Sequence, residues 1–128
     1  MRHFVALSGF FLTVLSLSPT PAHANFVNGN GLYDDCKSDK TDSLYHVKQS
    51  ACLSYIQGIV DGVDLENNYH KSERYYCLPK NVTMGQIRDV VAQFLESNPA
   101  KRHLPAAILV VVSLEEVFPC PSSKEIKK

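Results

Sequence analysis

The sequence predicts a small all-α domain, a disulfide-braced bundle of about four helices. Two observations lead to this fold class. Apolar residues recur at three- and four-residue spacing along several segments, as on one face of a helix. All four cysteines lie beyond an N-terminal leader, and an even number of cysteines in a small exported domain is typical of a disulfide framework.

The clearest helix begins at Thr83 and ends before Pro99. Gln86 follows Thr83 by three residues, which is the spacing of a capping box. In that motif each side chain accepts a hydrogen bond from the backbone of the other residue. Asn98 precedes a proline and is therefore disfavoured in helical conformation, so the helix should stop there. Its expected apolar face consists of Ile87, Val90, Val91, Phe94 and Leu95.

Residues 105–118 are apolar on nearly every side, and their valines favour a strand. The segment is longer than a usual buried strand, however, and Pro105 suits the first turn of a helix. We therefore predict a buried central helix here. The residues expected to face the core are Ala107, Ile108, Val111, Leu114 and Phe118.

The N-terminal half should contain two more helices. Residues 25–31 form a turn-rich lead, and residues 32–36 a short helix. A long helix should run from Leu44 to about Asn67, capped by Asp42 or Ser43. Its apolar positions at helical spacing are Leu44, Val47, Cys52, Tyr55, Ile56, Ile59, Val60 and Val63.

Gly58 and Gly62 interrupt the long helix and lie on one of its faces. Each glycine costs about 1 kcal/mol relative to alanine in a helix interior. We expect the close approach of another helix backbone, within the core of the domain, to offset this cost.

The four cysteines, Cys36, Cys52, Cys77 and Cys120, allow three pairings. We predict Cys36–Cys52 and Cys77–Cys120, because each of these bonds would join the ends of neighbouring antiparallel helices. A structural zinc site is the rival interpretation. It is disfavoured because no two cysteines have the two- to four-residue spacing that such sites prefer.

Residues 1–24 have the pattern of a secretory signal peptide: a positive start, an apolar run over 4–17 and the small-x-small motif Ala22-His23-Ala24. The apolar run is short for a membrane span. The exported chain would comprise one helical domain, residues 25–121, and a charged, flexible tail, residues 122–128. Arg2 is the leader's one basic residue, so the exported part has a nearly balanced charge, which argues against a nucleic-acid binder.

The sequence gives no positive evidence for catalysis or for a cofactor. His46, His70 and His103 lie on three different segments, without the close spacing of metal ligands. Ser54 and Ser113 lie inside predicted helices and lack the glycine-rich elbow of a hydrolase nucleophile. We therefore expect a protein that is not an enzyme and holds no metal.

Several short motifs occur in a set order along the exported chain. They are Gly29-Asn30-Gly31-Leu32 with Cys36, Cys52-Leu53-Ser54-Tyr55-Ile56-Gln57-Gly58, Asp61-Gly62, Cys77-Leu78-Pro79, Val82-Thr83 with Gln86, Phe94-Leu95, Asn98-Pro99 with Arg102-His103, and Phe118-Pro119-Cys120. In this order the chain resembles the Tai-type (resistance-associated) immunity proteins. These are periplasmic antagonists of peptidoglycan amidase toxins that type VI secretion systems deliver.

The resemblance implies a small helical, disulfide-braced protein without catalytic activity. It would act in the periplasm by plugging the active-site cleft of an amidase effector, often as a dimer, and would not associate with a membrane after leader cleavage. The motif residues support the fold and do not name the contact surface. A general periplasmic stress or chaperone-like protein without a toxin partner is the alternative, and a small periplasmic hydrolase is a more remote one.

The expected contact surface is the polar and aromatic connection over residues 67–81. Loops of this length are often binding elements. The expected partner-binding residues are Tyr69, His70, Arg74 and Tyr75, because aromatic and arginine side chains dominate interface energetics. A solvated connector held by Cys77 is the other interpretation of the same segment.

Overall fold

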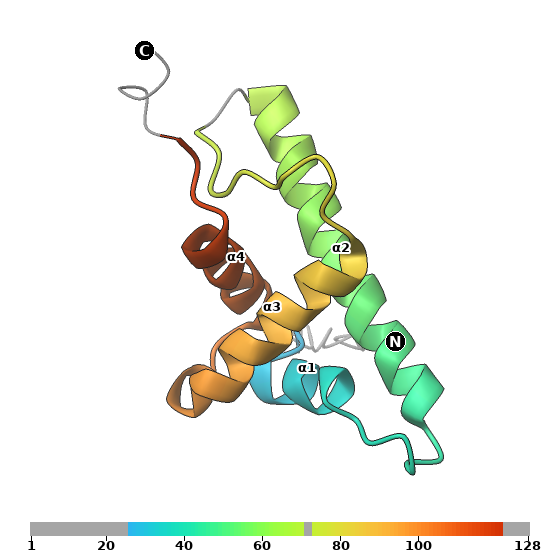
Figure 1. The fold of residues 1–128 in the computed structure, drawn as a ribbon. Helices are drawn as coiled ribbons and strands as arrows, with labels where there is room; N and C mark the ends of the chain where they lie inside the picture. The colour runs from blue at the N-terminus through green and yellow to red at the C-terminus, as the bar shows by residue number, and fades with distance from the viewer. Residues whose placement is uncertain (1–25, 71–72, 122–128) are drawn as a thin grey trace, which may run out of the picture.

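The computed structural model of the chain describes residues 26–70 and 73–121. This part contains four α-helices, α1 (Gly29–Cys36), α2 (Tyr45–His70), α3 (Met84–Ser97) and α4 (Ala106–Val117), and a 3₁₀ turn, η1 (Pro99–Lys101). The predicted all-α bundle of about four helices is confirmed. The predicted signal peptide and C-terminal tail lie outside the described residues. Helix α2 is the longest, and its C-terminal end lies at the opposite end of the molecule from α1 (Figure 1).

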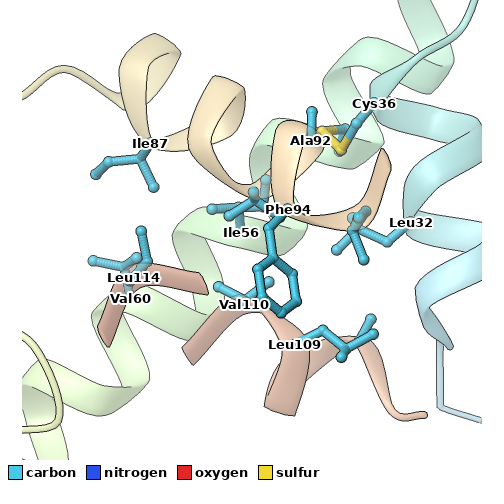
Figure 2. Close-up of a cluster of buried hydrophobic side chains, with 14 of the residues drawn as sticks. Leu32, Cys36, Ile56, Val60, Ile87, Ala92, Phe94, Leu109, Val110 and Leu114 are labelled. Atoms are coloured by element: carbon cyan, nitrogen blue, oxygen red, sulfur yellow. A yellow bond between two sulfur atoms is a disulfide. The ribbon is translucent and has the colours of Figure 1, made fainter. Parts of the chain in front are cut away.

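The core lies where the four helices meet. Figure 2 shows side chains from all four helices pointing into one centre. Burying each large aliphatic side chain in such a cluster contributes about 1.5–3 kcal/mol. The largest fully buried side chains are Leu32, Cys52, Ile56, Val91, Leu95, Leu109, Val110, Ser113 and Leu114.

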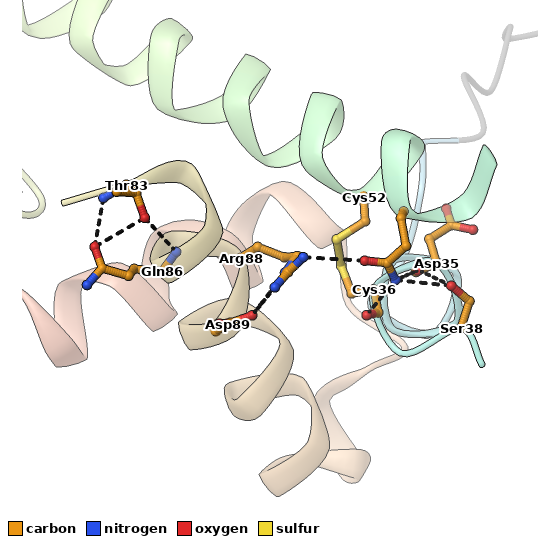
Figure 3. A network of polar contacts seen from close by, with 9 residues as sticks. Asp35, Cys36, Ser38, Cys52, Thr83, Gln86, Arg88 and Asp89 are labelled. Atoms are coloured by element: carbon orange, nitrogen blue, oxygen red, sulfur yellow. Dashed lines mark hydrogen bonds and ion pairs between the residues drawn. A yellow bond between two sulfur atoms is a disulfide. The ribbon is translucent and has the colours of Figure 1, made fainter. Parts of the chain in front are cut away.

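Helix α3 forms as its local signals predict. The backbone N–H of Thr83 donates to Gln86 Oε1 at 2.8 Å, and the N–H of Gln86 donates to Thr83 Oγ1 at 3.3 Å. This reciprocal pair is the predicted capping box (Figure 3). The helix ends at Ser97, just before the Asn98-Pro99 stop. Of its predicted apolar face, Val90 is half-buried and the other four residues are buried.

The segment predicted as a buried helix from its length does form helix α4. Its buried face, however, differs from the predicted one. Ile108 is 54% exposed, so its predicted place in the core is wrong. Among the other predicted core residues Leu114 is buried, whereas Ala107, Val111 and Phe118 are half-buried. The reason is that α4 is apolar all round, so its pattern does not indicate which side the other helices cover. The buried residues are Ala106, Leu109, Val110, Ser113 and Leu114.

Helix α1 begins three residues earlier than predicted, so the expected turn-rich lead is partly wrong. Asn28 caps the helix by accepting a hydrogen bond from the N–H of Gly31 at 3.0 Å. The N–H of Gly29 donates to the carbonyl of Leu104, in the α3–α4 connection, at 3.0 Å. A Cβ on Gly29 would overlap both the backbone of Arg102 and the side chain of Leu109. This glycine therefore permits a close contact that the sequence pattern does not reveal.

Helix α2 buries a narrower stripe than predicted. Cys52, Ile56 and Val60 are buried at four-residue spacing, whereas Leu44 and Val47 are 54% and 65% exposed. The carboxylate of Asp42 accepts from the N–H of Leu44 at 2.9 Å in the turn before α2, so this bond does not cap the helix, which begins at Tyr45. The first turns of α2 are therefore helical but are not covered by the core, and the prediction for Leu44 and Val47 is wrong.

The prediction that Gly58 and Gly62 receive another helix backbone is also wrong. Apart from neighbouring residues of α2 itself, no described atom lies within 4 Å of a Cβ placed on either glycine. Both residues are exposed on α2. Packing within the described part of the protein therefore does not explain why α2 carries two glycines in its interior.

Both predicted disulfides are confirmed. Cys36–Cys52 joins the end of α1 to α2, and Cys77–Cys120 joins the chain before α3 to the chain after α4. Around the first bond, the side-chain amide of Gln49 donates to the carbonyls of Asp35 and Cys36, both at 3.1 Å. Arg88 of α3 donates to the other end of the Gln49 amide at 3.5 Å (Figure 3). These contacts satisfy backbone carbonyls at the end of α1.

Candidate binding surface

The four predicted contact residues lie at and just after the C-terminal end of α2. Tyr69 and His70 belong to the last turn of the helix, and Arg74 and Tyr75 lie in the connection that leads to α3. All four are exposed, with Tyr69 at 78% and Tyr75 at 47%. Exposed tyrosines of this size are available for contact with another protein.

The connection after α2 is attached to the rest of the domain at Tyr76 and Cys77. Tyr76 is 4% exposed and belongs to the core cluster. The N–H of Cys77 donates to the carbonyl of Phe118 at 2.8 Å, and the Cys77–Cys120 disulfide lies beside this bond. Tyr75 is therefore held with its side chain outward, next to a residue whose side chain is inward. Such attachment reduces the conformational entropy that this connection would lose when a partner binds.

Burial raises the pKa of the Tyr76 phenol to about 12, and the nearby carboxylates of Asp64 and Asp61 add to the shift. The phenol therefore stays neutral at physiological pH. Its hydroxyl is buried without a hydrogen-bond partner among the described residues. The same carboxylates show that the C-terminal half of α2 presents negative charge near the connection.

A groove of about 520 Å³ lies between α2 and α4. Its lining is mainly apolar, and its charged members are Glu66 and Glu115. Ile108 and Val112 of α4 are 54% and 37% exposed. The full lining consists of Gly58, Ile59, Gly62, Val63, Glu66, Tyr75, Ala107, Ile108, Val111, Val112 and Glu115.

Sequence reasoning missed this groove, although two signals for it were present. The interior glycines of α2 and the all-round apolar character of α4 each remove the usual polar outer face of a helix. From the sequence alone both signals indicate internal packing, whereas the structure places the two faces side by side at the surface.

A second hollow, of about 560 Å³, lies among α1, α2 and α3 and is polar. Four of its charged groups form two pairs: Lys37 Nζ lies 2.9 Å from Glu96, and the Arg88 guanidinium lies 2.6 Å from Asp89. Lys40 also lines the hollow and belongs to neither pair. The hydrogen bond to Glu96 raises the pKa of the Lys37 ammonium. Exposed pairs of this kind contribute little stability and leave little net charge for a ligand.

The histidines in the described part of the chain do not gather into a metal site. His46 packs its ring edge-on against Tyr45, and His103 Nδ1 lies 2.9 Å from the carbonyl of Ala100. Across residues 26–70 and 73–121, no three His, Cys, Asp or Glu side chains gather closely enough to hold a metal ion. Nor does that part of the chain include a helix with the length and apolar character needed to cross a membrane.

A disulfide-braced helical domain with exposed tyrosines and an open apolar groove has features typical of proteins that act by binding another protein. Residues 28–120 match the family model of the Rap1a immunity proteins, and the chain belongs to this family. No curated protein and no solved structure gives a significant match.

Membership in an immunity-protein family of type VI secretion implies that the partner is a toxin effector. The predicted resemblance to immunity proteins is confirmed at this level. The two disulfides and the family together fit a protein that works outside the reducing cytoplasm.

Proposed function

We propose that the protein is a periplasmic immunity protein that neutralises a peptidoglycan amidase effector by covering its active-site cleft. The observation that carries this proposal is the exposed aromatic segment at the end of α2, in which Tyr69 is 78% and Tyr75 47% exposed. The family supplies the toxin partner. The resemblance to the Tai-type proteins supplies the amidase chemistry and the periplasmic setting.

In this mechanism the protein inhibits the effector by binding to it, and no chemical step by the protein is required. Tyr69, His70, Arg74 and Tyr75 would enter the cleft and exclude the peptidoglycan strand. Tyrosine and arginine suit this role because they combine large contact area with hydrogen-bonding ends. The Cys77–Cys120 disulfide holds the segment in place beforehand, which lowers the entropic cost of binding. A stable complex of this kind should bury at least about 1,000 Å² in total.

The test is hydrolysis of peptidoglycan fragments by the purified effector, titrated with the purified protein. We expect amidase activity to fall to background near one equivalent of the protein. Replacing Tyr69 and Tyr75 together by alanine should weaken inhibition at least about a hundredfold, since two interface anchors are removed. Phe26→Ala is a matched control, because Phe26 is 80% exposed but lies in the segment leading into α1.

An effector that keeps its full activity in an excess of the wild-type protein would remove the proposal. So would a double tyrosine variant that inhibits as well as the wild type, because the exposed segment would then lie outside the interface.

The resemblance also implies a homodimer, which remains part of the proposal. Sedimentation of the free protein at micromolar concentration tests this point, and a monomeric mass throughout would exclude it.

A further inference from the structure

We propose that the groove between α2 and α4 is the docking site for a helix of the toxin effector, one with an apolar face of small and aliphatic residues flanked by lysine or arginine. This inference rests on the proposed function only in requiring a toxin partner, and it does not depend on that toxin being an amidase. The groove would anchor the effector, while the exposed tyrosines beside it would cover the active site.

The first argument comes from Gly58 and Gly62. Glycine in a helix interior destabilises the helix, and here no contact inside the described protein requires it. The two residues are four positions apart and therefore share one side of α2. Both line the groove. A partner backbone could come close to α2 at these positions only because glycine has no side chain there.

The second argument is the shape and polarity of the groove. Its two long walls are helices, and Ile59, Val63 and Val111 give it an apolar floor and sides. Ile108 and Val112 remain 54% and 37% exposed in the free protein. A groove between two helices that is lined by aliphatic residues suits an amphipathic helix, which would place its apolar residues into it.

The third argument is charge. Glu66 and Glu115, the charged residues of the lining, are both acidic and both exposed. A partner helix with basic residues at the edges of its apolar face would pair with them. The lining contains no lysine or arginine, so the same face of a second copy of this chain offers no basic group to pair with them.

The fourth argument is continuity with the proposed inhibitory segment. Tyr75 belongs both to that segment and to the lining of the groove. An effector helix in the groove would therefore lie directly beside the residues proposed to enter the active site. Contact over both surfaces would also help to reach the area that a stable complex requires.

The decisive variant is Gly58→Ala with Gly62→Ala. Because the space at both positions is open, the protein should fold, and its melting temperature should rise by about 5–10 °C as helix propensity improves. Its affinity for the effector, inactivated at the catalytic nucleophile and measured by calorimetry, should fall at least about tenfold. A higher melting temperature together with a lower affinity is the expected result if this face of α2 binds the effector.

Gly85→Ala is the matched control. Gly85 lies in α3, and a Cβ there would make an ordinary contact of 3.8 Å with Thr83 Oγ1. This variant should leave the affinity unchanged. An affinity equal to that of the wild type in the Gly58→Ala, Gly62→Ala protein would overturn the inference.

A second pair of variants tests the chemistry of the partner. Glu66→Lys with Glu115→Lys should weaken binding at least about tenfold at low salt, and the difference from the wild type should shrink as salt is added. Tighter binding of this variant would contradict a basic partner helix. If sedimentation showed that Ile108→Asp dissociates a homodimer without changing effector affinity, a second copy of the chain would be the occupant and the inference would fail.

The outcomes separate the two proposals. An effector that binds the wild-type protein but stays active, or that is not an amidase, contradicts the proposed function while the affinities of the glycine variants still test the groove. Unchanged affinity of the double glycine variant contradicts the groove and leaves inhibition by the wild type standing.

Discussion

The guanidinium of Arg102 lies over the ring of Tyr33, with its central carbon 3.6 Å from the ring centroid. The same side chain donates through Nε to the carbonyl of Leu95 at 2.6 Å and through a terminal nitrogen to that of Glu96 at 3.2 Å. One residue in the α3–α4 connection therefore satisfies carbonyls at the end of α3 and packs on α1.

Replacing Arg102 by alanine should lower the free energy of unfolding by about 2–3 kcal/mol, because it removes the stacking on Tyr33 and leaves two carbonyls without their donor. The free energy of unfolding of Arg102→Lys should lie between those of the wild type and Arg102→Ala, since lysine keeps the charge without the planar guanidinium. Urea unfolding followed by circular dichroism measures both. Lys80→Ala, at an exposed position, should change stability by less than about 0.5 kcal/mol. Equal stability of Arg102→Ala and Lys80→Ala would contradict the assigned role.

Two glycines of α1 should respond in opposite ways. Gly29→Ala should cost at least about 2 kcal/mol, because its Cβ would overlap the backbone of Arg102. Gly31→Ala should be neutral or slightly stabilising, because its Cβ would lie at an ordinary 3.5 Å from Val27. Thermal unfolding of the two variants compares them directly. A Gly29→Ala protein as stable as Gly31→Ala would show that the connection can move away without cost.

The two disulfides should contribute different amounts to the free energy of unfolding. The Cys77–Cys120 bond closes 43 residues and the Cys36–Cys52 bond 16. The chain-entropy estimate then gives losses of about 4 and about 3 kcal/mol when each pair is replaced by alanine. Affinity for the effector should fall more for the Cys77, Cys120 variant, since that bond holds the segment of Tyr75. Greater destabilisation by the shorter closure would contradict the estimate.

Stability should fall between pH 10 and about pH 12. The pKa of Tyr76 is raised to about 12 in the folded protein, so the unfolded chain loses this proton at lower pH than the folded chain does. The contribution of Tyr76 is therefore complete below pH 10 and is lost as the pH rises through its folded pKa. Unfolding in urea at pH 9 and pH 11 measures this loss, which Tyr76→Phe should reduce. An equally steep decline in Tyr76→Phe would assign the effect to other groups.

Much of the fold could be predicted because it depends on short sequence motifs and on the number and order of the helices and cysteines. The Thr83–Gln86 capping box and the stop at Asn98-Pro99 act within a few residues, so the bounds of α3 followed from the pattern alone. The disulfide pairing followed from helix order, because the two bonds join segments that the connections between the helices already bring together. The prediction that Tyr69, His70, Arg74 and Tyr75 contact a partner rests on residue type, and the structure adds that all four are exposed.

The sequence by itself determined a helical, disulfide-linked domain, because helix periodicity, capping and cysteine number belong to each segment separately. The tertiary structure alone decided which side of each helix is covered. Helix α4 is apolar all round, and its core face depends on where α2 and α3 lie. Gly58 and Gly62 could receive a helix from this chain or from a partner, and the described fold leaves their face open. Burial is a property of neighbours distant in the sequence, so it could not be determined from any one segment.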